Sequence, residues 1–299
     1  MKYARNENDM SSIRTDGNAK KTKKGYFLSL MAIIILVILY AFAVQLASYK
    51  YEEYATLRNQ IFAEKVGFVL DDVRLDVEKI VSFSQQGNSS FVTISENHSY
   101  NKSQFFSAEK NNLDKFSNIS SIGINISYSL PLSLNFSNGM IYITNDSSPL
   151  NKIVKIFNST GNNLTITAYN ITIVSNQTRG SVTTPTFGSS GTYVVLRYVD
   201  PIPAKSFTSE GYLQPSSSNI WMIALPTPAK NITVTFGLID GKENSLSIRQ
   251  YDIDSMTYSV VGINMTSKND VEGKYNIFLN ISSPLGTPYA LYADFLKIR

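Results

Sequence analysis

The segment YFLSLMAIIILVILYAFAVQLA, residues 26–47, contains no Asp, Glu, Lys or Arg. A helix of about 22 residues is roughly 33 Å long, which is enough to cross a hydrocarbon core of about 30 Å. We therefore predict a membrane-spanning helix over residues 26–47. It separates a short tail or leader, residues 1–25, from a long polar remainder.

The positive charge of the chain is concentrated in front of this run. Residues 1–25 hold seven Lys or Arg and three Asp or Glu, whereas the rest of the chain holds 20 of each sign. Basic residues are retained on the cytoplasmic side, so we expect the N-terminus inside the cell and the C-terminal part outside. The basic balance therefore indicates a membrane flank and excludes a nucleic-acid partner. The polar tail before Lys20 is expected to be disordered.

Cysteine is absent from all 299 residues. This excludes disulfides, Cys-ligated metals and thiolate catalysis. A large external domain without disulfides is more typical of a bacterial or archaeal surface protein than of a secreted animal protein. It is long enough to bury a core of its own.

A helical pattern continues after the apolar run. Apolar residues recur at spacings of three, four or seven, which predicts an amphipathic stalk helix over residues 48–84. No proline interrupts it, so we expect one continuous helix from residue 26 to about residue 83. Gln85, Gln86, Gly87 and Asn88 are expected to end it. The stripe consists of Tyr51, Ala55, Phe62, Val66, Val69, Val73, Val77 and Ile80.

From residue 88 onward the pattern changes to a period of two. Alternating segments are separated by turn signals such as Asn138-Gly139 and Asp240-Gly241, which predicts strands joined by hairpins. We expect an α+β chain whose external part, residues 88–299, is an all-β antiparallel sandwich or barrel. Residues 97–120 fit a short helix or an irregular crossing, and residues 180–203 could divide two sub-sheets. The alternating segments are 122–126, 140–143, 164–167, 170–173, 231–236 and 275–279.

Asn-x-Ser/Thr acceptor sites are about twice as frequent as random placement predicts, and all follow the apolar run. In eight of them the middle residue is apolar, as in Asn125-Ile126-Ser127. On a strand this pattern places Asn in water and the middle residue in the core. We expect N-glycosylation at several sites; strand alternation in an Asn/Thr-rich protein is the alternative source of the motif. The sites are Asn88, Asn97, Asn101, Asn118, Asn125, Asn135, Asn145, Asn158, Asn163, Asn170, Asn176, Asn231, Asn264 and Asn280.

The sequence offers no catalytic, metal-binding or cofactor-binding constellation. His98 is the single histidine, and we expect it in a solvated loop, which argues against both a catalytic triad and a His-rich zinc site. Asp252 and Asp254 would share one face of a strand, and Asp240-Gly241-Lys242-Glu243 resembles a hairpin turn with Asp240 and Gly241 at its centre. A calcium ion that bridges such loops is the less favoured interpretation. Tyr193, Tyr198, Tyr251, Tyr258 and Trp221 are expected to pack in sheets and core rather than to stack on sugars.

The first eighty residues resemble archaeal type IV pilin or archaellin precursors. The shared features are the leader ending Lys23-Lys24-Gly25, the apolar helix directly after it, and an amphipathic extension into a β-domain rich in acceptor sites. The resemblance implies a prepilin-type peptidase that cuts between Gly25 and Tyr26, and a homo-oligomer formed through the N-terminal helix. Leu30 stands where that family carries a glutamate, so a membrane-anchored monomer or an uncut signal anchor remain the alternatives.

We therefore expect a single-pass, pilin-like structural or adhesion protein of the cell surface. We expect it to contact membrane lipid through its apolar helix and not to be an enzyme. The alternative is a membrane-anchored binding module for a surface glycan or small ligand, with its site on loops such as 203–219.

Overall fold

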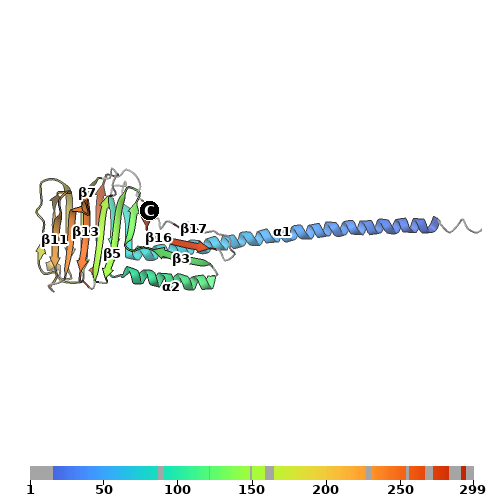
Figure 1. Cartoon of the computed structure of the whole chain (residues 1–299), viewed down its shortest axis with the longest axis horizontal. Helices are drawn as coiled ribbons and strands as arrows, with labels where there is room; N and C mark the ends of the chain where they lie inside the picture. Colours follow the sequence, from blue (N-terminus) through green and yellow to red (C-terminus); the bar gives the residue numbers. More distant parts are fainter. Residues whose placement is uncertain are drawn as a thin grey trace, which may run out of the picture. The chain divides into compact units, whose positions relative to one another are not determined.

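The computed structural model describes residues 16–86, 91–120, 122–148, 150–158, 165–226, 230–253, 256–266, 272–282 and 291–293. The chain divides into two compact units, residues 1–65 and residues 66–299. The first unit is helical, and the second contains the strands (Figure 1). The chain is thus an α+β protein in which one long N-terminal helix precedes a strand-rich unit.

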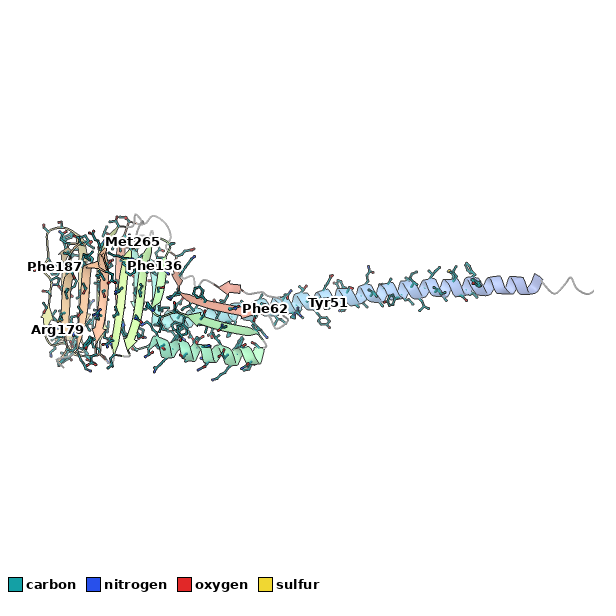
Figure 2. All side chains as sticks on the ribbon, viewed as in Figure 1. Tyr51, Phe62, Phe136, Arg179, Phe187 and Met265 are labelled. Atoms are coloured by element: carbon teal, nitrogen blue, oxygen red, sulfur yellow. The ribbon has the colours of Figure 1, made fainter. Side chains whose placement is uncertain are left out.

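Helix α1 spans Asp16–Ile80 and includes the predicted membrane-spanning run. It begins ten residues before the apolar segment, so Lys20 is already helical, and the expectation of a disordered tail up to that residue is wrong for residues 16–19. Residues 1–15 lie outside the described part. Every side chain from Tyr26 to Tyr54 is exposed, and Figure 2 shows Tyr51 projecting from this part of the helix. The first unit therefore contains a helix that is long enough and apolar enough to cross a membrane.

The last turns of α1 belong to the strand-rich unit. Val66, Val69, Val73, Val77 and Ile80 are all buried, so the predicted stripe is covered by the chain's own second unit from Val66 onward. The members of the stripe before residue 65 are exposed or half-buried.

The helix ends at Ile80, four residues earlier than the expected stalk boundary at residue 84. Strand β1 (Val81–Gln86) follows at once and pairs with β2 (Phe91–Glu96). Val81 and Phe83 are buried, with Ser82 and Ser84 more exposed. The spacing of Val77, Ile80 and Phe83 suits a helix, but the alternation from Val81 suits a strand. Pairing with β2 decides between them.

The strands form three sheets among the described residues. In order across each sheet, they are β1-β2-β14-β7-β9-β10, β15-β4-β5-β6-β13-β12-β11-β8 and β17-β16-β3. The remaining bounds are β3 Gly123–Tyr128, β4 Leu132–Phe136, β5 Met140–Ser148, β6 Asn151–Asn158, β7 Ile166–Ser175, β8 Val182–Thr183, β9 Thr192–Val199, β10 Phe207–Leu213, β11 Asn219–Ala224, β12 Asn231–Ile239, β13 Lys242–Tyr251, β14 Met256–Met265, β15 Gly273–Tyr275, β16 Ile277–Ser282 and β17 Leu291–Ala293.

Buried side chains join the six-stranded and eight-stranded sheets. The rings of Phe83 on β1 and Phe136 on β4 lie 5.0 Å apart, and Figure 2 labels Phe136 within the strand-rich unit. The Trp221 indole N–H on β11 donates to Ser209 Oγ on β10 at 3.0 Å. Trp221 is fully buried, which confirms its expected place in the core.

One strand pair departs from the expected antiparallel arrangement. Strands β7 and β9 pair in parallel, whereas the other pairs between described strands are antiparallel. The chain between them, residues 176–191, is too long for a hairpin and places β8 in the eight-stranded sheet before it returns. A crossover of a dozen or more residues is what a parallel pair requires.

Residues 97–120, for which a helix or an irregular crossing was expected, contain helix α2 (Lys102–Ser120). It lies beside β3 (Figure 1), where Phe106 stacks on Tyr128 with ring centroids 4.5 Å apart. Phe116 faces Phe68 of α1 at 6.3 Å. Helix α2 thus covers the junction between the end of α1 and the three-stranded sheet.

The hairpin predicted at Asp240-Gly241 is confirmed. Ile239 pairs with Lys242, and both central residues have positive φ angles, 50° and 74°, as a type I′ turn requires.

The expectation that Asp252 and Asp254 share one face of a strand is wrong, because β13 ends at Tyr251 and Asp252 lies in a bend with a φ angle of 52°. Asp254 lies outside the described residues.

Candidate functional site

The two residues of the predicted processing site are helical in α1. Tyr26 is exposed in the described chain. A cut between Gly25 and Tyr26 would leave the whole apolar run at the new N-terminus. The cut itself remains a prediction.

Most of the described acceptor asparagines have exposed or half-buried side chains. Those on strands are Asn125, Asn135, Asn145, Asn158, Asn170, Asn231, Asn264 and Asn280, and those elsewhere are Asn97, Asn101, Asn118 and Asn176. Asn88 and Asn163 lie outside the described residues. The surface is therefore compatible with sugar attachment at these sites, and occupancy remains a prediction.

The alternation expected within the acceptor sites holds on strands and fails on the helix. The middle residue is buried at Ile126, Phe136, Ile171, Ile232, Met265 and Ile281. Ile119 is 85% exposed, because Asn118-Ile119-Ser120 ends helix α2 and a helix has no period of two. Leu164 lies outside the described residues.

The acceptor sites Asn97 and Asn101 already use their side-chain oxygen. Asn97 Oδ1 accepts a hydrogen bond from the Ser99 N–H at 3.0 Å. Asn101 Oδ1 accepts one from the Gln104 N–H at 3.1 Å and so caps helix α2. Both contacts use the oxygen and leave the amide nitrogen, the atom that carries an N-linked sugar, available for attachment.

His98 is buried, which corrects the expectation of a solvated loop histidine. It continues the inward positions of β2, after Val92, Ile94 and Glu96, so the alternation over 91–96 was the signal that could have located it. His98 Nε2 lies 2.8 Å from Ser259 Oγ on β14. Its Nδ1 lies 3.8 Å from Glu96 Oε1, which is beyond hydrogen-bond distance.

These contacts belong to a buried ion cluster, which we define as Glu96, His98, Lys102, Asp146 and Lys152. Lys102 Nζ donates to Glu96 Oε1 at 2.7 Å and to Asp146 Oδ1 at 2.9 Å. The Lys102 backbone N–H donates to the other Asp146 oxygen, also at 2.9 Å. One lysine at the start of α2 thus holds the end of β2 and the last residues of β5 together.

Hydroxyl groups complete the coordination of the Glu96 carboxylate. Thr144 Oγ1 donates to Glu96 Oε1 at 2.6 Å, and the Tyr142 hydroxyl donates to Glu96 Oε2. Lys152 Nζ donates to the backbone carbonyl oxygens of His98 and Tyr100. The loop between β2 and α2 is therefore fixed from both sides by lysines.

Burial and mutual attraction set the protonation states of the cluster. Burial alone raises the pKa of Glu96, but the adjacent Lys102 ammonium and the hydrogen bonds outweigh it and lower that pKa to about 2. Burial lowers the pKa of His98 to about 4, so its ring is neutral at pH 7. Burial lowers the pKa of Lys102, but Glu96 and Asp146 reverse this and raise it. Burial lowers the pKa of Lys152.

The cluster has the residue types of a serine–histidine–carboxylate site, but it is closed to external substrates. Ser259, His98 and Glu96 are each no more than 2% exposed. A substrate from solution cannot reach a nucleophile in that position without unpacking the sheets. The arrangement can act only on groups of the protein itself.

A second group of acidic side chains lies between α1 and α2. Carboxylate oxygens of Asp72, Asp76 and Glu109 lie within 4.8 Å of one another. Burial, followed by a hydrogen bond to Asp76, raises the pKa of Glu109 to about 7. Asp76 also pairs with Lys79. Sequence reasoning placed its candidate carboxylates on the later strands; the four-residue spacing of Asp72 and Asp76 on a helix was the available signal.

A shallow hollow of about 300 Å³ lies over β6, β12 and β13. Its lining is Lys155, Thr233, Thr235, Leu238, Ile239, Asp240, Ser247 and Arg249, with Lys155 paired to Asp240. The hollow has no aromatic lining and does not involve loop 203–219. That segment instead contains the short 3₁₀ helix η1 (Pro203–Lys205) and strand β10.

The tyrosines divide between core and surface. Tyr198 is fully buried, and its hydroxyl donates to the Gln177 carbonyl at 2.8 Å, which confirms the packing role. Tyr193 forms an edge-to-face pair with Tyr212 at 5.2 Å, and Tyr251 is half exposed. The side chain of Tyr258 lies outside the described set.

In comparisons with known proteins, no family model, no curated protein and no solved structure matched this chain.

Proposed function

We propose that this chain is a single-pass, membrane-anchored structural protein of the cell surface. The apolar part of α1 holds it in the bilayer with the N-terminus in the cytoplasm. The strand-rich unit stands outside, its two larger sheets forming a sandwich that carries N-linked sugars. The flanking Lys20–Lys24 and the position of every acceptor site beyond the apolar run support this orientation.

The observation that carries the proposal is the change in the surface of α1 along its length. Side chains from Tyr26 to Tyr54 are all exposed, although most are apolar. From Val66 the apolar stripe is buried within the strand-rich unit. Exposed apolar surface of this extent requires lipid or other helices around it. The partners that we propose are the α1 helices of other copies of this protein, as in pilin-like filaments.

Single-cysteine labelling tests the orientation, because the natural chain has no thiol. Thr22→Cys lies before the apolar run, and Ser216→Cys lies in an exposed turn of the strand-rich unit. In a host that lacks a prepilin-type peptidase, so that residues 1–25 are kept, a membrane-impermeant maleimide added to intact cells should label Ser216→Cys and leave Thr22→Cys unlabelled until the cells are lysed. Labelling of Thr22→Cys alone in intact cells would reverse the proposed topology and remove the proposal.

Two further measurements test the pilin-like form. Intact mass of membrane-derived protein should correspond to a chain that begins at Tyr26. Ile38→Cys, in the middle of the apolar run, should form disulfide-linked dimers in the membrane, whereas Ser216→Cys should not. A chain that still begins at Met1 and forms no dimers through residue 38 would be a solitary signal-anchored protein instead.

The second candidate is a binding module, and the hollow on β6, β12 and β13 favours it. Arg249 and Lys155 beside hydroxyl groups suit an anionic or sugar ligand. However, Thr233 of that lining also belongs to the acceptor site Asn231-Ile232-Thr233, and its hydroxyl contacts Asn231 Oδ1 at 3.2 Å. A sugar on Asn231 would crowd the hollow. Binding of cell-surface polysaccharide that is lost in Arg249→Ala and retained in Asn231→Gln would favour this second function.

A further inference from the structure

The three residues at the centre of the buried ion cluster have the arrangement needed to join two side chains covalently. Lys102 Nζ lies 2.9 Å from Asp146 Oδ1. The carboxyl carbon of Asp146 is then no farther than ~4.1 Å from the nitrogen, since a carbon–oxygen bond adds at most ~1.2 Å. Glu96 Oε1 lies 2.7 Å from the same nitrogen. The nucleophile, Lys102 Nζ, is therefore in contact with both the electrophile, the Asp146 carboxyl group, and a proton carrier, the Glu96 carboxylate.

We infer that Lys102 and Asp146 condense to an intramolecular isopeptide bond, with Glu96 as the catalytic proton carrier. This inference is independent of the membrane topology proposed above. It concerns only the chemistry of the strand-rich unit, and it assigns the cluster a role that plain ion pairing does not.

The groups that react are sealed from water. The side chains of Lys102, Glu96 and Asp146 are 0%, 1% and 4% exposed. Holding reacting groups in contact replaces a bimolecular encounter with one of very high effective concentration, on the order of 10⁵ M or more. The dry surroundings also hinder hydrolysis of the product.

Each oxygen of the Asp146 carboxyl group has a different partner. Oδ1 faces the amine, and Oδ2 accepts the backbone N–H of Lys102 at 2.9 Å. A fixed backbone donor stabilises the negative charge that develops on this oxygen when the amine adds. Oδ2 is therefore the oxygen that remains as the amide carbonyl, and Oδ1 is the oxygen that leaves.

The step balances without any other reactant. Glu96 takes a proton from the Lys102 ammonium and delivers it to Asp146 Oδ1. The amine electron pair then forms the N–C bond to Asp146 Cγ. Glu96 takes a second proton from this nitrogen and delivers it to the departing oxygen as the C–O bond breaks. The products are one amide and one water molecule, and Glu96 returns to a carboxylate.

Burial of charge supplies the driving force. The two carboxylates, Lys102 and Lys152 place four charged groups in or beside one buried cluster, and keeping ions out of water is costly. Condensation removes one positive and one negative charge and leaves the Glu96 carboxylate with Lys152. The ion pair raises the pKa of Lys102, so the neutral amine is scarce and the bond forms slowly after folding.

Mass spectrometry of the full chain in detergent tests the inference. Protein produced in a host without N-glycosylation, kept folded at pH 7 and then denatured, should be lighter than its sequence mass by one water molecule. A protease digest should contain a branched peptide that joins the segment around Lys102 to the segment around Asp146. The deficit should grow with incubation time.

Matched variants locate the chemistry. Glu96→Gln keeps the shape of the carrier but cannot take up and release a proton, so it should show no deficit; Lys102→Arg should also show none. Lys155 and Asp240 form an exposed ion pair away from the cluster, so Asp240→Ala should keep the full deficit. The wild-type digest decides the question even where a variant fails to fold.

Two outcomes would overturn the inference. The first is a wild-type mass equal to the sequence mass after prolonged incubation of the folded protein. The second is a water deficit with no branched peptide, because a cyclic imide at Asp146-Ser147 loses water without joining two segments.

Discussion

The hydroxyl of Tyr275 donates a hydrogen bond to the backbone carbonyl of Val81 at 2.7 Å, across 194 positions of sequence. Tyr275 lies on β15, and Val81 is the first residue after α1. Both side chains are buried. This bond ties the end of the long helix to the edge of the eight-stranded sheet, at the point where the helix gives way to a strand.

Removing that hydroxyl tests the junction. Tyr275→Phe leaves the Val81 carbonyl buried without its donor, which should lower the free energy of unfolding of the strand-rich unit by about 1–3 kcal/mol. Urea unfolding in detergent, followed by tryptophan fluorescence of Trp221, would measure it. Tyr251→Phe, at a half-exposed position, is the control and should change little. Equal stability of the two variants would contradict the role assigned to Tyr275.

The covered part of the α1 stripe should be sensitive to truncation, whereas the apolar run should not. Val73 is 1% exposed and Val37 is 61% exposed. Val73→Ala removes the two buried methyl groups of the valine side chain and leaves a cavity. It should lower the free energy of unfolding of the strand-rich unit by about 2 kcal/mol. Val37→Ala should leave the unfolding midpoint of that unit unchanged. A similar loss from both would mean that the stripe is not packed from Val66 onward.

His98 should make the protein sensitive to acid. Burial lowers its pKa from 6.5 to about 4, so the unfolded chain binds a proton that the folded chain rejects between these values. Its contribution, on the order of 3 kcal/mol, is therefore present above pH 6.5 and is lost as the pH falls through 4. In the chain before condensation, in which Lys102 is still an ammonium, Glu96 adds a further loss below pH 4.5, because its folded pKa is about 2. In His98→Gln the unfolding free energy should fall less between pH 6.5 and pH 4.5; an unchanged slope would refute the prediction.

Glu109 should act in the opposite direction. Its folded pKa is raised from 4.5 to about 7, mainly by burial and by the hydrogen bond to Asp76. The folded chain then holds a proton that the unfolded chain releases, so this stabilisation is complete below pH 4.5 and is lost as the pH rises through 7. Glu109→Gln, which mimics the protonated acid, should make stability rise more steeply with pH across this range. Urea titrations at pH 5 and pH 8 measure the change, and Glu243→Gln, at an exposed position, should show none.

Local patterns in the sequence predicted the elements well, where one physical preference dominated. The run of residues 26–47 could only be an apolar helix, and the alternation from residue 122 could only suit strands with one buried face. Six middle residues of acceptor sites are buried as that alternation predicts. The Asp240-Gly241 turn followed from the ease with which these residues take positive φ angles. These properties belong to a few neighbouring residues, so no knowledge of the fold was needed.

Contacts between distant segments decided the rest. The spacing of Val77, Ile80 and Phe83 would have allowed the helix to continue beyond Ile80, but the pairing of β1 with β2 ended it there. His98, the middle residue of an acceptor site, became a buried ring only because β14 brought Ser259 to it. Lys102 and Asp146 are 44 positions apart and meet because α2 begins beside β5. Hydrophobic period is a local property, whereas the partner of a buried charge depends on which strands close together. The sequence by itself therefore determined a long apolar helix and a strand-rich unit, and the tertiary structure alone assembled the cluster of Glu96, Lys102 and Asp146.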